Sequence, residues 1–355
     1  MQIKTHFPAC KQIIKSKQKA LKGEEETLKG ELKGDEAFAG LDIGFGDFKG
    51  IIAGGRKIKF PTAVAYARKS ITDIGEASET YTFIDREYLV GQEAIFNAFS
   101  TRSLEFLIKY APLMCYKAFK DIVGVSHLAV GLPVGFYIAE NREALSKALR
   151  SFEVNGDKKQ FHVEVFPQGV GILIDYRYDH NGQEIKDTDT NGIIVDLGHF
   201  TIDVVPFERG VAVRDGSGML EGEGISKACD ELADHIQAET KVRLNEQETK
   251  DVFLKGKLPI YGKERDFSTV IRDIVEGYIE EVINTISSRW ERRIQRADKL
   301  ILAGGGAYYL KQYIPSRYKD LIHIPDELEF ANARGFFKGL KLKYADAKTE
   351  EGLSE

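Results

Sequence analysis

Residues 38–55 read FAGLDIGFGDFKGIIAGG, and this stretch decides the fold prediction. An apolar run ends at Asp42, glycines follow at Gly44 and Gly46, and a second apolar run returns after Lys49. The pattern predicts two antiparallel strands joined by a tight turn that carries a carboxylate. Such a carboxylate can reach a hydrated Mg²⁺ while the backbone N–H groups of the turn approach phosphate oxygens. By itself, this stretch is also compatible with a plain hairpin whose lysine is exposed.

The same pattern recurs in residues 192–213, which read GIIVDLGHFTIDVVPFERGVAV. Asp196 takes the place of Asp42, and Thr201 adds a hydroxyl that can donate to a phosphate. We expect His199 to contribute its backbone N–H rather than its ring, because the seven scattered histidines form no metal-ligand cluster. Two such hairpins indicate two related α/β domains that face one cleft.

The role of Asp203 stays open at this point. It leaves the second turn along the return strand, where a structural strand-end carboxylate and a functional one are equally compatible with the sequence.

A third glycine motif lies near the end of the chain. A short strand over Lys299–Ala303 runs into Gly304, Gly305 and Gly306, and a helix is expected to begin there. Without Cβ atoms these glycines let a base or ribose pack on the backbone, and a helix N-terminus favours anions. The alternative is a flexible strand-to-helix turn.

Two other phosphate-binding motifs are excluded. The chain contains no G-x-x-x-x-G-K-[ST], so it has no P-loop. The glycines that follow Asp42 miss the G-x-G-x-x-G spacing by one residue, and no β-α-β crossover is predicted after them.

Composition limits the remaining classes of function. The chain has 355 residues, enough for two domains, and a formal net charge of −5, so a direct nucleic-acid reader is not expected. No apolar run is long enough to span a bilayer and no secretory signal opens the chain. Cys10, Cys115 and Cys229 have no metal-ligand spacing, which favours reduced thiols and a cytoplasmic location.

The pattern of apolar residues predicts the remaining long elements. Residues 1–36 are dominated by Lys, Glu and Gly and are predicted to be a charged extension, either a solvated tail or a short helix that docks on a partner. Apolar spacing predicts helices over 103–119, 224–239 and 266–294, and a strand over 127–131.

The order and wording of the three glycine motifs resemble one superfamily. The motifs DIGFGDFK, DLGHFTID and LAGGGAYY look like the phosphate-one, phosphate-two and adenosine motifs of the actin, sugar-kinase and heat-shock ATPase superfamily. The resemblance covers roughly residues 38–340. The segments VGQEA at 90–94, GLPVGFY at 131–137 and FANARGF at 330–336 are most similar to plasmid-segregation actins of the ParM/StbA type and archaeal actin-like proteins.

This resemblance implies an α/β protein with the actin-like ATPase fold, in which two related ribonuclease-H-like domains surround a nucleotide cleft. Domain I would comprise residues 37–187 completed by 325–345, domain II would comprise 188–324, and 346–355 would form a C-terminal tail.

It also implies the residues of a site for ATP or ADP with Mg²⁺. Asp42 and Asp196 would hold the metal ion, mostly through waters. The phosphates would contact seven residues of the two turns: Gly44, Phe45, Gly46, Lys49, Gly198, His199 and Thr201. The adenosine would lie against Gly304, Gly305 and Gly306, with Lys227 and Glu231 near the ribose and base.

The same resemblance places a water-positioning residue at Gln168, just before a helix that bridges the domains. Because a neutral amide orients water but accepts a proton poorly, we expect slow ATP hydrolysis.

The leading hypothesis is an ATPase that polymerises with itself into cytoskeletal filaments for plasmid or DNA segregation, with a DNA-binding adaptor protein as a further partner. A small-molecule kinase of the same superfamily is the alternative, with Asp121 as the candidate base. A chaperone or reactivase-type ATPase is the third hypothesis, and the short segment after the adenosine motif gives little room for a peptide-binding domain.

Overall fold

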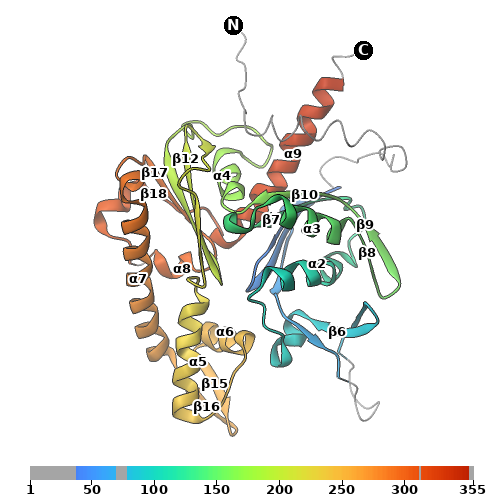
Figure 1. Cartoon of the computed structure of the whole chain (residues 1–355), viewed down its shortest axis with the longest axis vertical. Coiled ribbons are helices and arrows are strands. Elements are labelled where there is room, and N and C mark those ends of the chain that lie inside the picture. The colour runs from blue at the N-terminus through green and yellow to red at the C-terminus, as the bar shows by residue number, and fades with distance from the viewer. Residues whose placement is uncertain (1–36, 69–77, 312, 352–355) are drawn as a thin grey trace. The chain divides into compact units, whose positions relative to one another are not determined.

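The two quoted hairpins form the centres of two separate sheets in the computed structural model of the chain (Figure 1). The structure describes residues 37–68, 78–311 and 313–351. The first sheet has the order β10-β7-β1-β2-β3, where the strands are β10 His162–Pro167, β7 His127–Leu132, β1 Phe38–Ile43, β2 Asp47–Ile52 and β3 Lys57–Pro61. Because β1 pairs parallel with β7 and antiparallel with β2, the first hairpin lies inside a mixed sheet.

The second sheet repeats this arrangement with the second hairpin. Its order is β13-β12-β11-β17-β18, and β14 also pairs with β12; the strands are β13 Val211–Ala212, β12 Thr201–Glu208, β11 Gly192–Leu197, β17 Lys299–Ala303, β18 Ile322–His323 and β14 Gly218–Glu221. β11 pairs parallel with β17 and antiparallel with β12. β1 and β11 are buried along their whole length, as continuous apolar strands in a covered sheet should be.

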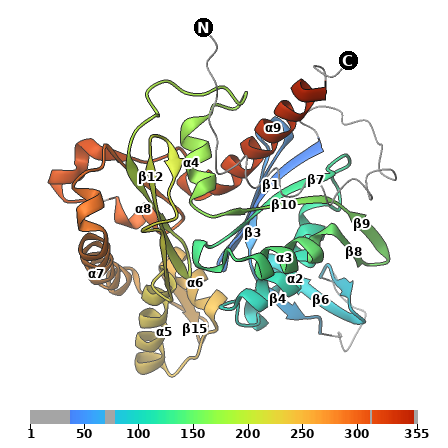
Figure 2. The ribbon, with the colours of Figure 1, turned by 45° about the horizontal axis from the view of Figure 1, so that its top comes forward.

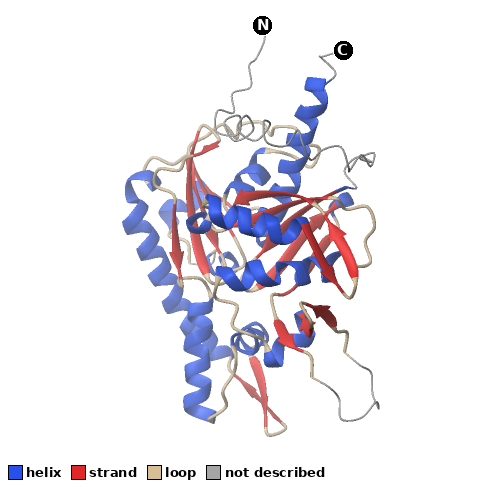
Figure 3. Ribbon diagram, turned by 45° about the vertical axis from the view of Figure 1, so that its right-hand side comes forward, coloured by secondary structure: helices blue, strands red, loops and turns tan. Residues whose placement is uncertain are grey.

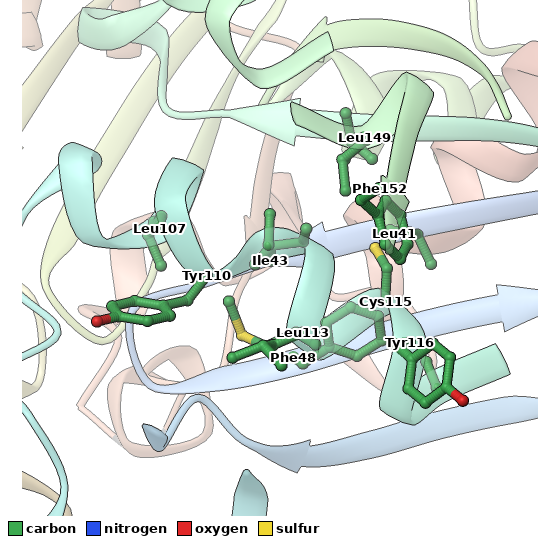
Figure 4. Close-up of a cluster of buried hydrophobic side chains, with 14 of the residues drawn as sticks. Leu41, Ile43, Phe48, Leu107, Tyr110, Leu113, Cys115, Tyr116, Leu149 and Phe152 are labelled. Atoms are coloured by element: carbon green, nitrogen blue, oxygen red, sulfur yellow. The ribbon is translucent and has the colours of Figure 1, made fainter. Parts of the chain in front are cut away.

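Helix α2, Leu104–Phe119, covers the first hairpin and confirms the helix expected over 103–119. The Ser103 hydroxyl caps it by accepting a hydrogen bond from the Phe106 amide at 3.1 Å. Figure 4 shows Leu113 of α2 next to Phe48 of β2, with Ile43 of β1 close by, within one buried apolar cluster. Helix α3, Ala139–Arg150, packs beside α2.

Two helices cross closely beside the first sheet. Helix α4, Val170–Arg177, packs against α9, Ala331–Glu351, and α9 also lies on β1, β7 and β2 (Figure 2). The crossing requires glycine, because a Cβ on Gly335 would lie 1.7 Å from the Gly171 carbonyl oxygen. Since α9 continues to Glu351, the helix extends beyond residue 345, where the predicted completion of domain I ends.

The second sheet carries its own helices. They are α5 Ser226–Thr240, α6 Glu246–Lys255, α7 Ser268–Ile294 and the single turn α8 Ala307–Leu310. Asn245 begins α6 with a capping box closed by Glu248, and Gly256 ends it at a φ of 74°. Figure 3 shows two groups of strands, each accompanied by helices. The helices expected over 224–239 and 266–294 are confirmed as α5 and α7.

Several small elements complete the described part of the fold. They are a three-stranded sheet of order β4-β6-β5 (β4 Val64–Tyr66, β6 Arg86–Val90, β5 Tyr81–Phe83) and two hairpins, β8 Ser151–Val154 with β9 Asp157–Gln160 and β15 Lys257–Ile260 with β16 Lys263–Asp266.

The cysteines and the chain ends complete the comparison with the sequence. Cys115 and Cys229 are free thiols buried in the two largest apolar clusters. Cys10 and the predicted extension over 1–36 lie outside the described residues. Among the residues that are described, none of the helices combines the length and the apolar character that crossing a bilayer requires.

Candidate nucleotide site

The first hairpin brings a buried carboxylate to its turn. Asp42 is 6% exposed and lies opposite Lys49 in the strand register. The Lys49 ammonium is 3.1 Å from Oδ2 of Asp42, and the Gln168 side-chain amide donates to Oδ1 at 2.8 Å. Burial opposes the charge on Lys49, but Asp42 and Asp47 outweigh it and raise the pKa of this lysine. The carboxylate is therefore held by two donors.

The second hairpin places a carboxylate, Asp203, where the first has a lysine. Asp196 lies opposite Asp203, and both are buried. Asp203 accepts a hydrogen bond from the Val134 amide at 2.7 Å and one from the Thr201 hydroxyl at 3.2 Å. Burial, followed by the charge of Asp196, raises the pKa of Asp203 to about 8. This side chain is therefore predominantly protonated at neutral pH.

Asp196 is close enough to the first hairpin to respond to its charge. Burial raises the pKa of Asp196 to about 6, and the negative charge of Asp42 adds to the shift. The Asn332 side-chain amide donates to Oδ2 of Asp196 at 2.6 Å and acts in the opposite direction. The structure thus brings together the two carboxylates that the sequence nominated for metal binding.

The turns of the two hairpins are built alike and held from behind. The Gly44 amide donates to the Asp47 carbonyl at 3.1 Å, and the Gly198 amide donates to the Thr201 carbonyl at 3.0 Å. Thr62 donates to the carbonyls of the first turn, whereas backbone amides at the start of α5 donate to those of the second. Across the described residues, four turn amides donate no hydrogen bond that the structure records: those of Phe45, Gly46, His199 and Phe200. Amides free in this way are suited to bind anions.

The two turns touch each other directly. The rings of Phe45 and Phe200 meet edge to face with their centroids 5.1 Å apart. Gly46 lies against His199, so that a Cβ on Gly46 would be 2.8 Å from the His199 Cβ. Burial, helped by Lys250, lowers the pKa of His199 to about 3, and its Nε2 has no partner within the described residues. The ring is therefore neutral at physiological pH.

The third glycine motif lies beside the second hairpin. β17 runs parallel to β11 with Ala303 opposite Asp196. Gly304 has a φ of 84°, and a Cβ there would lie 2.4 Å from Oδ1 of Asp196, whereas a Cβ on Gly305 would enter open space. The helix expected after Gly306 does begin at Ala307, but it is only the single turn α8, so its N-terminus adds little support for anion binding at this motif.

Three nominated residues do not join this group. The Lys227 ammonium is held by Glu223 and Glu281 at 2.8 and 2.6 Å. Glu231 is exposed on α5, and in the described part of the chain neither its side chain nor that of Lys227 bonds to the hairpins. Asp121, the candidate kinase base, lies in the turn after α2 with its side chain 84% exposed. It precedes β7, whereas Asp42 lies at the opposite, C-terminal end of the neighbouring strand β1.

Lys250 and Asn332 are among the contacting residues that were not assigned to the site from the sequence. The Lys250 ammonium, on α6, donates to the Gly46 carbonyl at 2.7 Å and to Asp47 at 2.5 Å. No local pattern distinguishes this lysine, because α6 is an ordinary polar helix. Asn332 had a weak signal, since it is one of two polar side chains, with Arg334, in the otherwise apolar segment FANARGF, but its contact with Asp196 is long-range.

Comparison with known proteins decides the family. Residues 40–171 match the family of actin-like protein N-terminal domains, and residues 194–315 match the C-terminal domain of archaeal MreB-like actin homologues. The chain is an actin-like protein. Each of the two matched segments contains one of the two hairpins.

Relatives of known type agree with this assignment. The chain is 25% identical over 329 residues to an archaeal actin homolog of Thermoplasma volcanium, covering 84% of this chain and 96% of the relative. An archaeal actin homolog solved in complex with ADP superposes with a TM-score of 0.68 at 22% identity, over 86% of this chain and 99% of the other. A 15-stranded ParM filament from Clostridium botulinum gives 0.67 at 20% identity, over 87% and 99%. The actin-like fold expected from the sequence is confirmed.

Proposed function

We propose that this actin-like protein binds ATP with Mg²⁺ between its two hairpins, hydrolyses it slowly and assembles with copies of itself into cytoplasmic filaments. The observation that carries the proposal is the placement of Asp42 and Asp196. They occupy equivalent positions of two hairpins, and the charge of one raises the pKa of the other. The free amides of both turns lie beside them.

The residues present fit a magnesium ion bound mainly through water and phosphate. Mg²⁺ prefers hard oxygen ligands, and proteins usually hold it with one or two carboxylates together with substrate phosphates. Asp42 and Asp196 supply such oxygens. In the described ranges no three His, Cys, Asp or Glu side chains come together as a metal-binding group. When bound, the ion would neutralise charge on the β- and γ-phosphates.

The nucleotide is expected to contact both hairpins and the third glycine motif. Amides of Phe45, Gly46, His199 and Phe200 would donate to phosphate oxygens, and Lys49 would add a positive charge. The open space over Gly305 is adjacent to Asp196 through Gly304, which suits a ribose or base that packs on backbone. The archaeal actin homolog with ADP, which shares this fold, supports a nucleotide as the ligand.

Hydrolysis is assigned to a water held near Gln168. This side chain is 7% exposed and donates to Asp42, which fixes its amide group beside the proposed metal site. An amide orients water without accepting its proton, so we expect a turnover slow enough for hydrolysis to time the disassembly of a polymer.

Assembly is proposed from the likeness to ParM. The ParM filament from Clostridium botulinum shares the fold, which supports self-assembly. A role of the filament in DNA segregation, with a DNA-binding adaptor that joins it to its cargo, is the further part of this proposal. Asp121, the candidate base of the kinase alternative, is exposed and precedes β7, at the opposite end of the sheet from Asp42, so it does not support that alternative.

Sedimentation of the pure protein with Mg–ATP, with Mg–ADP and without nucleotide tests the proposal, alongside Asp196→Ala. We expect ATP-dependent pelleting that the variant loses, together with release of phosphate. A wild-type protein that stays unassembled and binds no adenine nucleotide would refute it.

A further inference from the structure

Asn332, at the start of α9, connects two parts of the candidate site. Its side chain is 4% exposed. Its Oδ1 accepts a hydrogen bond from the Gly169 amide at 3.0 Å, and its Nδ2 donates to Asp196 Oδ2 at 2.6 Å. Both polar ends of the amide are therefore used, one by the backbone after Gln168 and one by the carboxylate of the second hairpin.

The chemistry of the two partners fixes the orientation of this amide. A backbone N–H can only donate, so the oxygen of Asn332 must face Gly169. A carboxylate accepts, so the nitrogen must face Asp196. A carboxylate or a single short hydroxyl in this position could not satisfy both partners at once, whereas an asparagine amide does.

Through Asn332 the hydrogen bonds form one continuous path between the hairpins. Lys49 and Gln168 donate to Asp42; Gly169 follows Gln168 in the chain and donates to Asn332, which donates to Asp196. Gly169 is held at a φ of 80°, a conformation that side chains rarely adopt. The path thus passes through a backbone position that is itself tightly constrained.

The backbone that carries Asn332 cannot shift easily. A Cβ on Gly171 would lie 2.9 Å from the Asn332 carbonyl oxygen, and α4 and α9 approach closely again at Gly335. The start of α9 is therefore a rigid platform for its side chain.

We propose that Asn332 is a positioning residue: it holds Asp196 and the backbone after Gln168 in the relative positions that the metal-bound nucleotide requires. This inference rests on the proposed function. Partners that hydrogen-bond a metal-binding carboxylate orient it, and their loss typically costs about 10–100-fold in metal affinity or activity. Asn332 contacts neither nucleotide nor ion itself. Its effect is expected only in the part of binding that depends on Mg²⁺.

The test compares Asn332→Ala with Gln247→Ala. Gln247 is also a buried side-chain amide on a helix near its N-terminus, and it donates at 3.4 Å to the carbonyl of Thr62, which holds the first turn from behind. Within the described residues it has no recorded hydrogen bond to Asp42 or Asp196. ADP binding is measured by calorimetry with excess Mg²⁺ and with EDTA, and ATP hydrolysis is measured against the Mg²⁺ concentration. Hydrogen–deuterium exchange of the segment around Gly169 follows the lost bond directly.

We expect Asn332→Ala to weaken ADP binding in Mg²⁺ about 10–100-fold, leave the affinity in EDTA unchanged, and speed exchange around Gly169. Gln247→Ala should leave the ratio of the affinity in Mg²⁺ to the affinity in EDTA unchanged, because any effect through Thr62 on the first turn does not depend on the ion. Equal behaviour of the two variants would overturn the inference while leaving the proposed function intact, provided that wild type binds Mg–ADP. A wild-type protein without Mg–ADP affinity would overturn both.

A second variant keeps the test decisive if Asn332→Ala fails to fold. Asn332→Ser retains a hydroxyl that can satisfy one partner, so we expect an intermediate loss confined to the Mg²⁺-dependent affinity. A full loss in EDTA as well would contradict the positioning role.

Discussion

The two hairpins share a backbone and differ in charge. In both, the Asp of the first strand faces a residue seven positions later on the return strand, and a glycine amide closes the turn. In the first hairpin that residue is Lys49, which forms an ion pair with Asp42. In the second it is Asp203, whose pKa burial and Asp196 raise to about 8. The first hairpin therefore carries a carboxylate paired with a cation. The second carries two buried carboxyl groups that repel each other when both are ionised.

This difference indicates that the two hairpins, although alike in backbone, contribute differently to charge at the site. The charge of Asp196 also raises the pKa of Lys49, so this one cation interacts with the carboxylates of both hairpins. A phosphate-bound cation would stabilise the carboxylates of the second hairpin more than that of the first, because only the second hairpin lacks a positively charged partner of its own.

Removing Lys49 should have the largest effect. Lys49→Met leaves Asp42 buried without its cation, and breaking a buried ion pair from one side costs about 3–5 kcal/mol in the free energy of unfolding. Urea denaturation at neutral pH measures this loss. Lys59→Met is the control, because Lys59 lies next to Lys49 in register and pairs with Glu329 at the surface, where about 0–1 kcal/mol is expected. Equal losses would show that Lys49 has no special electrostatic role.

Asp203→Asn should remove the unfavourable free energy of ionising a second buried carboxyl group beside Asp196 at high pH. The pKa of Asp203 is about 8 in the folded protein, against an ordinary value of 3.8, so its contribution to stability is complete below pH 3.8 and is lost as the pH rises through 8. We compare the free energy of unfolding of the variant with that of wild type, both without metal. We expect this difference to be larger above pH 8 than at acidic pH by more than about 1.4 kcal/mol, the equivalent of one pKa unit. Denaturation curves across this range measure the gain. A difference that does not vary with pH would contradict the assignment of a protonated Asp203.

Substitutions at two glycines beside the second hairpin should have different effects, one on nucleotide binding and the other on stability. Gly305→Ala adds a methyl group to open space, so stability should stay unchanged while ADP affinity falls about tenfold, or 1.4 kcal/mol. Gly304→Ala places its Cβ against Asp196 at a positive φ and should destabilise the protein itself. Thermal melts and ADP titrations of both variants measure the contrast. Normal ADP affinity in Gly305→Ala would remove this surface from the site.

The contact between the turns should have the smallest effect. A double-mutant cycle with Phe45→Ala and Phe200→Ala measures the coupling of their edge-to-face rings, which we expect to be about 0.5–1.5 kcal/mol in the free energy of unfolding. Zero coupling would mean that the two turns are not in contact in solution.

The sequence predicted those elements whose signals are local. The helix expected over 103–119 is α2 over Leu104–Phe119, and the strand expected over Lys299–Ala303 is β17. Both hairpins have the expected strands, because alternation between apolar runs and glycine turns is a strong short-range pattern.

Contacts between distant segments were not predictable in this way. Lys250 reaches the first turn from a helix about which the sequence says nothing distinctive, and Asn332 meets Asp196 only because α9 crosses α4. The length of α8 was not predictable either, since three glycines are compatible with either a long helix or one turn. The domain bounds and the roles of the nominated site residues remain predictions.

The most direct test is a crystal structure of the protein with Mn²⁺ and ADP, in which anomalous scattering locates the ion. Our account predicts the ion between Asp42 and Asp196, with phosphate oxygens at the free amides of both turns. An ion or a nucleotide bound elsewhere, with the two hairpins still closed on each other, would contradict it.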